Sequence, residues 1–568
     1  MPLGLPFRLP LGLRQRRVAV RRAENTRSEP SAFHFELPHH PAHRERGERS
    51  WRERLFGRPA GTVRDRKSSD PSPALPPALQ WVDEFIANVR SFVVVRPEDR
   101  LLIRMPNQAH RLNATGVRVL GFLLDGGTAA ELFREIGEES RRTRDVTRFL
   151  LDVRRCLSGE LREDNAGCGV EIVPLDLHFS DLPVLSEVAL TRRCNLRCVF
   201  CYAGCGNGPR SHGRAADPTA FGFPESPAPE SEDSPVPDME TREVETILRR
   251  IRNRARVPSV SFTGGEPTLR PDLAHLVRYA ARDLGMRTNL ITNGTRVDAD
   301  LAGRLAESGL ASAQVSIEAP GADLHDAIVG VPGAFERSRR AVAHFRTAGV
   351  SVHANTTIHR RNFHAAAEMP RFAREILGLD RLSMNMVIPA GSAAGESRDS
   401  PLVRYAEIAE AVLAVQRAAA AADVEFLWYS PTPLCLFNPI LADLGNKGCS
   451  ACDGLLSIDA RGRVLPCSSC EDPVGDLLRE DFSAIWQGAR ATRYRNKELA
   501  HPACRACEHF PFCHGACPLY WNHFGFDELV AARGFPPCPP PRIPPADDPD
   551  SQTAAWSGDE RAADPSPP

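Results

Sequence analysis

Three cysteines on one short loop constrain this chain more than any other feature of the sequence. Cys194, Cys198 and Cys201 form a C-x3-C-x2-C run directly after the apolar segment 185–190, which we expect to be a strand. Thiolates are soft ligands, and three of them on one loop suit a metal centre that takes its fourth ligand from elsewhere. The run by itself predicts either an iron–sulfur cluster or a tetrahedral zinc site.

The other cysteines also favour metal binding over disulfide bonds. The chain of 568 residues contains 16 Cys: Cys156 and Cys168 are isolated, Cys205 follows the first run, and ten more lie between positions 435 and 538. A secreted disulfide scaffold would spread its cysteines over one small domain. Two separate groups with C-x2-C and C-x3-C spacings instead indicate a cytoplasmic protein in a reducing compartment. We do not expect Cys205 to be a ligand.

Charge and composition narrow the range of partners. Lys and Arg number 71 and Asp and Glu number 72, so the formal net charge is −1. This balance favours neither a nucleic acid nor a membrane as a partner, and no run of about 18 apolar residues predicts a transmembrane helix. We expect a disordered basic and Pro-rich extension over 1–87, a flexible insertion over 203–239 and a disordered tail over 541–568.

Residues 185–400 alternate strand-like and helix-like segments. Six strands are expected at 186–190, 257–262, 287–291, 313–317, 351–357 and 382–388. Helices are expected at 240–251, 273–284, 299–308, 334–348 and 365–376, with a further one at 403–422. Such alternation predicts an α/β fold in which helices cover a parallel sheet. Functional residues are then expected at the carboxyl ends of the strands.

Several motifs, taken in order along the chain, resemble those of the radical S-adenosylmethionine (radical SAM) enzymes. They are the Cys run with Phe200 before its last Cys, the strand ends Gly264-Gly265-Glu266 and Thr292-Asn293-Gly294, and Ser316. The resemblance implies a partial, TIM-like (β/α)6 barrel in which Cys194, Cys198 and Cys201 hold a [4Fe-4S] cluster that binds SAM. It also implies SAM contacts from Phe200, Gly264, Gly265, Glu266, Asn293, Ser316 and Asn355.

The second cysteine group resembles the SPASM extension of radical SAM peptide maturases. Cys452, Gly462 and Cys467 give C-x9-G-x4-C, with a hairpin expected around Arg461-Gly462, and the rest of the pattern is Cys504-x2-Cys507-x5-Cys513-x3-Cys517 followed by Cys538. The resemblance implies a SPASM domain over 431–540 with two auxiliary [4Fe-4S] clusters. One takes Cys467, Cys517 and two more cysteines, and the other takes Cys504, Cys507, Cys513 and Cys538. Cys435, Cys449, Cys452 and Cys470 compete for the two open places, for which we expect Cys449 and Cys452, with Cys435 next.

One position departs from a related family. Anaerobic sulfatase maturases carry an Asp directly after the Cys that follows Gly-x4, where it accepts a proton. This chain has Ser468 at that position. We therefore do not expect formylglycine formation, and the sequence names no catalytic base.

Residues 88–165 form a separate globular stretch. Two strands at 91–95 and 101–105 precede three helices, one of which begins with a capping box of Thr128 and Glu131. This winged-helix-like pattern resembles the peptide chaperone of pyrroloquinoline-quinone biosynthesis, also called the RiPP recognition element. The resemblance implies that a precursor peptide's leader adds to the edge of its sheet. The alternative is a winged helix that binds DNA or only packs.

Together these features predict a radical SAM oxidoreductase or maturase. Reductive cleavage of SAM would give a 5′-deoxyadenosyl radical that abstracts hydrogen from a ribosomally made precursor peptide. The electron donor would be a flavodoxin or ferredoxin. One alternative is an enzyme of small-molecule cofactor biosynthesis, acting on a tetrapyrrole or a quinone. A second is a scaffold protein with structural zinc.

Overall fold

The computed structural model of the chain describes residues 79–105, 108–136, 140–158, 180–205, 237–394, 400–445, 447–541 and 543. Most of the predicted extension at 1–87 and of the insertion at 203–239 lies outside these residues, as does the tail after 543. Within the described part of the chain, no helix is long and apolar enough to cross a membrane.

The first described module is a small antiparallel sheet with helices. Its elements are α2 (Val82–Val89), β1 (Val93–Arg96), β2 (Leu101–Arg104), β3 (Gln108–Arg111), α3 (Ala114–Leu124), α4 (Ala129–Ile136) and α5 (Ser140–Ser158). The strand order is β1-β2-β3, so β3 is an edge strand of this sheet. The predicted capping box is confirmed, because Glu131 accepts a hydrogen bond from the Thr128 backbone (2.9 Å) and Thr128 accepts one from the Glu131 backbone (3.2 Å).

Two elements of this module were not predicted. Helix α2 begins at Val82, so the prediction of disorder up to residue 87 is wrong for its last residues, where Val82 and Ile86 are buried. Strand β3 is short and polar in sequence, and it forms because its residues pair with β2.

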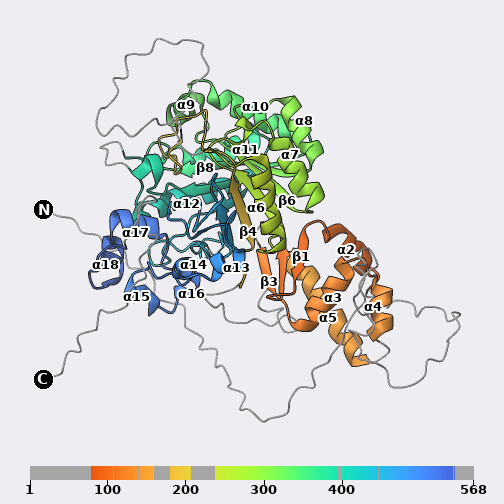
Figure 1. Cartoon of the computed structure of the whole chain (residues 1–568). Coiled ribbons are helices and arrows are strands. Elements are labelled where there is room, and N and C mark those ends of the chain that lie inside the picture. Colours follow the sequence, from red (N-terminus) through yellow and green to blue (C-terminus); the bar gives the residue numbers. More distant parts are fainter. Residues whose placement is uncertain are drawn as a thin grey trace, which may run out of the picture. The chain divides into compact units, whose positions relative to one another are not determined.

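A parallel sheet with helices on its outer side forms the middle of the chain, coloured from yellow to teal in Figure 1. Its strands are β4 (Leu185–Ala189), β5 (Ser259–Thr263), β6 (Arg287–Thr292), β7 (Leu310–Ser316), β8 (Ser351–Ile358), β9 (Arg381–Met386) and β10 (Glu425–Trp428). The main helices are α6 (Thr241–Asn253), α7 (Leu273–Arg278), α8 (Ala299–Ser308), α9 (Ala322–Val329), α10 (Ala334–Thr347), α11 (Met369–Glu375) and α12 (Tyr405–Ala422). The predicted α/β class and the six strands are confirmed; α9 and the four-residue strand β10 are additions.

The Cys-rich region continues the same sheet beyond β4. Strand β11 (Leu455–Ile458) pairs in parallel with β4, and β12 (Arg463–Leu465) and β13 (Gly475–Asp476) follow in antiparallel order. The predicted hairpin is confirmed, with Gly462 at φ +85° in its turn. Its pairing with β4 was not predicted. Six short helices complete the region: α13 (Phe482–Gln487), α14 (Ala489–Arg495), α15 (Pro502–Arg505), α16 (Phe510–Cys513), α17 (Pro518–Phe524) and α18 (Asp527–Arg533).

A buried arginine joins the end of β1 to the segment that leads into β4. The Arg96 side chain is 2% exposed and pairs with Asp99, which is 3% exposed, at 2.6 Å. Arg96 also donates to the carbonyls of Pro183 (2.6 Å) and Leu182 (3.0 Å). The guanidinium therefore provides hydrogen bonds to one carboxylate and two backbone carbonyl oxygens that are buried in the fold.

We predict that Arg96→Met destabilises the chain, because it leaves Asp99 buried without its cation. Removing one partner of a buried ion pair costs about 3–5 kcal/mol. The free energy of unfolding, measured by anaerobic denaturant titration, is expected to fall by that order. The control is Arg96→Met combined with Asp99→Asn, which removes both charges and is expected to lose less. Equal stability of the single variant and the parent would contradict this account.

Candidate active site

The three thiols lie on the loop that follows the carboxyl end of β4. Backbone hydrogen bonds fix this loop to two distant segments: Arg197 donates to Val329 (2.9 Å), Val199 donates to Ile328 (3.1 Å) and Ser392 donates to Cys201 (2.8 Å). The end of α9 thus holds the middle of the loop. The unpredicted helix α9 is therefore part of the site.

The three thiols have different electrostatic surroundings. Burial raises the pKa of Cys194 to about 12 and that of Cys198 well above its usual value. A hydrogen bond from the Cys205 thiol, with backbone amides of residues 203–205, lowers the pKa of Cys201 to about 6 despite its burial. Cys205 therefore supports the Cys201 thiolate, a role that the sequence did not indicate. The donor set is three thiols on one loop, which is the ligand type of an iron–sulfur cluster.

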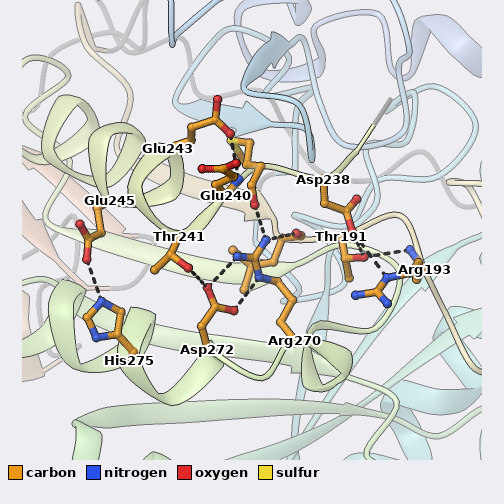
Figure 2. Close-up of polar contacts among 12 residues, drawn as sticks. Thr191, Arg193, Asp238, Glu240, Thr241, Glu243, Glu245, Arg270, Asp272 and His275 are labelled. Carbon is orange, nitrogen blue, oxygen red and sulfur yellow. Dashed lines mark hydrogen bonds and ion pairs between the residues drawn. The ribbon is translucent and has the colours of Figure 1, made fainter. Parts of the chain in front are cut away.

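Arg270 fixes both ends of the segment that carries the loop (Figure 2). Its guanidinium donates to the carbonyl of Leu190 at the end of β4 (3.0 Å) and to that of Met239 just before α6 (2.6 Å). Asp272 holds the guanidinium through two hydrogen bonds of 2.8 and 2.7 Å and accepts a third from Thr241. Burial opposes ionisation of Asp272, but the bonds from Arg270 and Thr241 lower its pKa overall.

A second set of polar contacts shapes the first residues of the loop. Thr191 donates its hydroxyl to Asp238, and Asp238 also accepts from the backbone of Arg192 at 3.0 Å. The Thr191 hydroxyl in turn accepts from the backbone of Arg193 at 3.0 Å (Figure 2). This turn directs the chain away from the strand and toward Cys194.

The predicted Gly264-Gly265-Glu266 motif packs backbone to backbone against the same turn. Gly265 donates to the carbonyl of Thr191 (2.7 Å), and Glu266 donates to that of Arg193 (2.8 Å). A Cβ on Gly265 would lie 2.2 Å from the Arg193 carbonyl oxygen, and Gly264 has φ +137°. Both positions therefore need glycine, one for space and the other for its backbone conformation.

Glu266 is fully buried and its carboxylate joins two strand ends. It accepts from the Thr268 backbone (3.0 Å), from the Thr292 hydroxyl (2.7 Å) and from the Asn293 backbone (2.8 Å). Burial raises its pKa, although these hydrogen bonds oppose the shift. The carboxylate lies beside the cluster loop. Its Oε1 accepts three hydrogen bonds, including one from the Thr268 hydroxyl, whereas Oε2 accepts only the one from Asn293 and keeps a lone pair for a further donor.

The other predicted SAM contacts lie at neighbouring strand ends. The Asn293 side chain donates to Asn195 on the cluster loop at 3.0 Å. Asn355 is 7% exposed and donates to Asn385 at 3.0 Å. The half-buried Ser316 on β7 is the register partner of Asn355 on β8. The structure thus places these residues at the carboxyl ends of the strands, as predicted. Their contacts with SAM remain predictions.

Phe200 stacks on a histidine that the sequence did not single out. The Phe200 and His359 rings lie 5.0 Å apart at 26°. His359 Nδ1 accepts from a backbone amide, so its proton lies on Nε2, which has no partner within the described residues. Burial lowers the pKa of His359 to about 4, so the ring is neutral and offers one hydrogen-bond donor.

Two further carboxylates lie near the site, and of these Glu187 was not singled out from the sequence. Glu318 is buried at the end of β7 near Cys198, and burial raises its pKa to about 8. Glu187 lies in the middle of β4, half-buried, where it accepts from Ser457 at 2.7 Å and from Ser468. Burial raises the pKa of Glu187, although both serines oppose the shift. Its signal in the sequence was a charged residue inside an otherwise apolar strand.

A hollow that is partly open to solvent is lined by Ser457 and Ser468, the two serines that bond to Glu187; Glu187 itself does not line it. Its lining includes Arg192 and Tyr202 from the cluster loop side, Gly264, and Ser457 and Ser468 from the Cys-rich region. The hollow therefore lies between the predicted SAM site and the hairpin that carries Cys467.

The distal thiols are those of the Cys-rich region, and the first group of them lies at the end of β4 opposite the cluster loop. Cys452 precedes β11 and Cys467 follows β12, and the Cys452 backbone donates to Pro466 at 3.1 Å. Burial raises the pKa of Cys467 well above its usual value, and the neighbouring thiols of Cys470, Cys449 and Cys517 raise it further. Five thiols thus share this region: Cys449, Cys452, Cys467, Cys470 and Cys517. The four predicted ligands of the first auxiliary cluster are among them, and Cys470 is the additional one.

The second distal group contains Cys504, Cys507 and Cys513, as predicted. The thiols of Cys513, Cys435 and Cys507 add to the burial that raises the pKa of Cys504 to about 12. Cys538 is half-buried, and its thiol faces the carbonyl of Pro539 at 3.5 Å. Among the described residues, no three His, Cys, Asp or Glu side chains are close enough to enclose a single metal ion. The ligand roles of the distal cysteines remain predictions.

Comparisons with known proteins agree with this geometry. The family model of the radical SAM superfamily matches residues 188–373, and that of the iron–sulfur cluster-binding SPASM domain matches residues 449–508. The first match spans β4 to α11, and the second includes the β11–β12 hairpin. The predicted resemblance to radical SAM and SPASM proteins is therefore confirmed.

Individual relatives fall into two functional groups. An AdoMet-dependent heme synthase from Nitratidesulfovibrio vulgaris is 28% identical over 59% of this chain and 88% of its own length. A PqqA peptide cyclase from Bradyrhizobium diazoefficiens is 26% identical over 59% of this chain and 81% of its own. The crystal structure of Streptococcus suis SuiB bound to precursor peptide SuiA matches with a TM-score of 0.52 and 16% identity, over 76% of this chain and 95% of SuiB, which shows a shared fold.

We predict that Gly265→Ala disrupts the cluster loop, because the added Cβ collides with the Arg193 carbonyl. A misplacement of about 1 Å near the reacting groups can cost roughly 100-fold in rate, so anaerobic 5′-deoxyadenosine formation is expected to fall by that order. Gly303→Ala in α8 is the matched control, since nothing lies within 4 Å of its added Cβ. If both variants cleaved SAM like the parent, the proposed backbone contact would not control the loop.

Proposed function

This chain is a radical SAM enzyme with an iron–sulfur cluster-binding SPASM domain, and we propose that it modifies a ribosomally made precursor peptide. The observation that carries the proposal is the hollow between the cluster loop and the SPASM hairpin. We propose a cytoplasmic location and a flavodoxin or ferredoxin as electron donor, because cluster-bearing thiols need a reducing compartment.

The N-terminal module supports a peptide substrate. Its strand β3 lies at the edge of the small sheet, and edge strands accept an extended peptide by main-chain hydrogen bonding. Residues 180–568 are about two thirds of the chain, so a SuiB match that covers 76% extends into residues before 180. We infer that this module holds the leader while the core of the peptide enters the barrel. Relatives named PqqA peptide cyclase agree with this substrate class.

The cluster and SAM together supply, when bound, a carbon-centred radical that abstracts hydrogen from an unactivated carbon. Cys194, Cys198 and Cys201 would hold the cluster, and Glu266 with its strand-end neighbours would orient SAM. The residues around the hollow would bind the substrate and keep water away from the reacting carbon.

Glu187 lies between two groups of thiols, which are at opposite ends of β4. Cys194 follows the carboxyl end of β4, whereas Cys452 and Cys467 lie at its amino end, because β11 runs parallel to β4. A strand of five residues spans roughly 17 Å. Glu187 lies about midway, and Ser457 and Ser468, which line the hollow, both bond to it. We propose that its carboxylate accepts a proton from the substrate through a serine hydroxyl.

A second candidate function is tetrapyrrole synthesis. Relatives named AdoMet-dependent heme synthase match this chain over the same share of its length as the peptide cyclases do. The N-terminal module separates the two functions, since a small substrate has no leader for it to hold.

The direct test needs a candidate precursor peptide, and any short open reading frame next to the gene that encodes a leader-like sequence is the first source to try. The full chain, reconstituted anaerobically and supplied with SAM and a reductant, is expected to change the mass of the whole peptide. The same peptide without its leader is expected to react much more slowly, and free leader added in trans is expected to inhibit by competing for the module. Equal modification with and without the leader would contradict leader binding. Consumption of a tetrapyrrole instead of the peptide would favour the second function.

We predict that Glu187→Gln separates SAM cleavage from product formation. Loss of a general base typically costs about 10²–10⁴-fold, so modified peptide should fall by at least the lower figure while 5′-deoxyadenosine still forms. Glu245→Gln is the matched control, because that half-buried carboxylate bonds to His275 at 2.7 Å on the outer helices (Figure 2). Full product formation by Glu187→Gln would exclude this role of the carboxylate.

A further inference from the structure

We propose that Cys435, in place of Cys538, is the fourth thiolate of the iron–sulfur site formed by Cys504, Cys507 and Cys513. The proposal rests on the iron–sulfur chemistry of the SPASM region and does not depend on the nature of the substrate. Cys435 lies before the segment matched by the SPASM family model, in the loop that follows β10.

The three thiols of the site are held by two linked helical turns. The Cys507 backbone donates to Cys504 (3.0 Å), that of Phe510 donates to Cys507 (3.0 Å) and that of Cys513 donates to His509 (2.9 Å). These bonds connect α15 to α16 and fix the thiols relative to one another. Three thiols on two short turns leave one coordination position of a four-iron cluster to be supplied by another segment.

The loop that carries Cys435 reaches this site by direct contact. The backbone amide of Leu434 donates to the sulfur of Cys513 at 3.4 Å. The loop itself is ordered by a turn in which Leu436 and Phe437 both donate to the carbonyl of Pro433, at 2.9 and 3.0 Å. An amide aimed at a cysteine sulfur is the outer-shell contact that stabilises a ligating thiolate. Cys435 is the next residue in the chain, so this contact brings its backbone next to the site.

Charge interactions agree with this placement. The thiols of Cys513 and Cys507 lie close enough to the exposed Cys435 thiol to interact with it electrostatically. The Arg533 guanidinium at the end of α18 likewise interacts with both Cys435 and Cys504. One cation thus lies near a thiol from each of the two segments, which agrees with their closeness.

Cys538 is the competing ligand, and its surroundings suit the role less well. The carbonyl of Pro536 accepts from His501 at 3.0 Å, so this segment passes near α15. However, Cys538 is flanked by Pro536, Pro537, Pro539, Pro540 and Pro541. Proline has no amide hydrogen and a fixed φ. These neighbours therefore offer no amide to a thiolate and restrict movement of the backbone that would turn the Cys538 thiol toward the site.

The test compares Cys435→Ala with Cys538→Ala in the full chain, reconstituted anaerobically with iron and sulfide. Mössbauer spectra and chemical analysis give the iron content per chain, and electron paramagnetic resonance detects a three-iron cluster. Cys435→Ala is expected to lose one cluster or to convert it to the three-iron form, whereas Cys538→Ala is expected to keep the parent's iron content. Cys156→Ala, a half-buried thiol on α5, controls for the loss of a cysteine as such.

The opposite pattern would overturn the proposal, as would loss of a cluster in both variants or in neither. Cys435→Ser checks for misfolding, because it keeps nearly the same volume with a poorer ligand and is expected to show the same iron loss. SAM cleavage gives a further check, since the distant cluster at Cys194, Cys198 and Cys201 is expected to remain active in all four variants.

Discussion

The close approach of two backbone segments at the carboxyl end of β4 is the constraint on which the site depends. Gly264 and Gly265 allow the end of β5 to lie against residues 191–193, where a single methyl group would collide with a carbonyl oxygen. Arg270 fixes both ends of the same segment through the carbonyls of Leu190 and Met239. The loop that carries the three thiols is therefore held by main-chain contacts of the protein itself. These contacts thus fix the loop on which the three predicted cluster ligands lie.

A second constraint is the continuity of the sheet. Because β11 pairs in parallel with β4, the SPASM region is an extension of the barrel wall and shares its core. The loop with Cys194, Cys198 and Cys201 and the first group of distal thiols consequently lie at opposite ends of the same strands. The space between them contains Glu187 and Ser468. A substrate bound there would be close to both groups of thiols. This position suits a reaction in which the substrate loses hydrogen at one end of the strands and an electron at the other.

Local patterns predicted much of the fold and the site. The strand–helix alternation, the Gly-Gly-Glu turn after β5 and the hairpin around Gly462 each depend on residues close in sequence, and all are present. The sequence could not show that β11 pairs with β4, that α9 holds the cluster loop, or that Glu187 contacts Ser468, since each joins segments far apart in the chain. Strand β3 was missed because its four residues are mostly polar, unlike those of the equally short β1 and β2. Cysteine spacing alone likewise did not decide which cysteines of the Cys-rich region would bind each auxiliary cluster.

The central claim is that the thiols after β4 hold the cluster that cleaves SAM. The most direct measurement is anaerobic formation of 5′-deoxyadenosine and methionine by the reconstituted chain, compared with Cys198→Ala under the same reductant. Cys156→Ala serves as the control for removing a thiol outside the site. The account predicts cleavage by the parent and the control, and none above background by Cys198→Ala. Equal cleavage by all three proteins, or stoichiometric zinc and no iron in the parent, would contradict it.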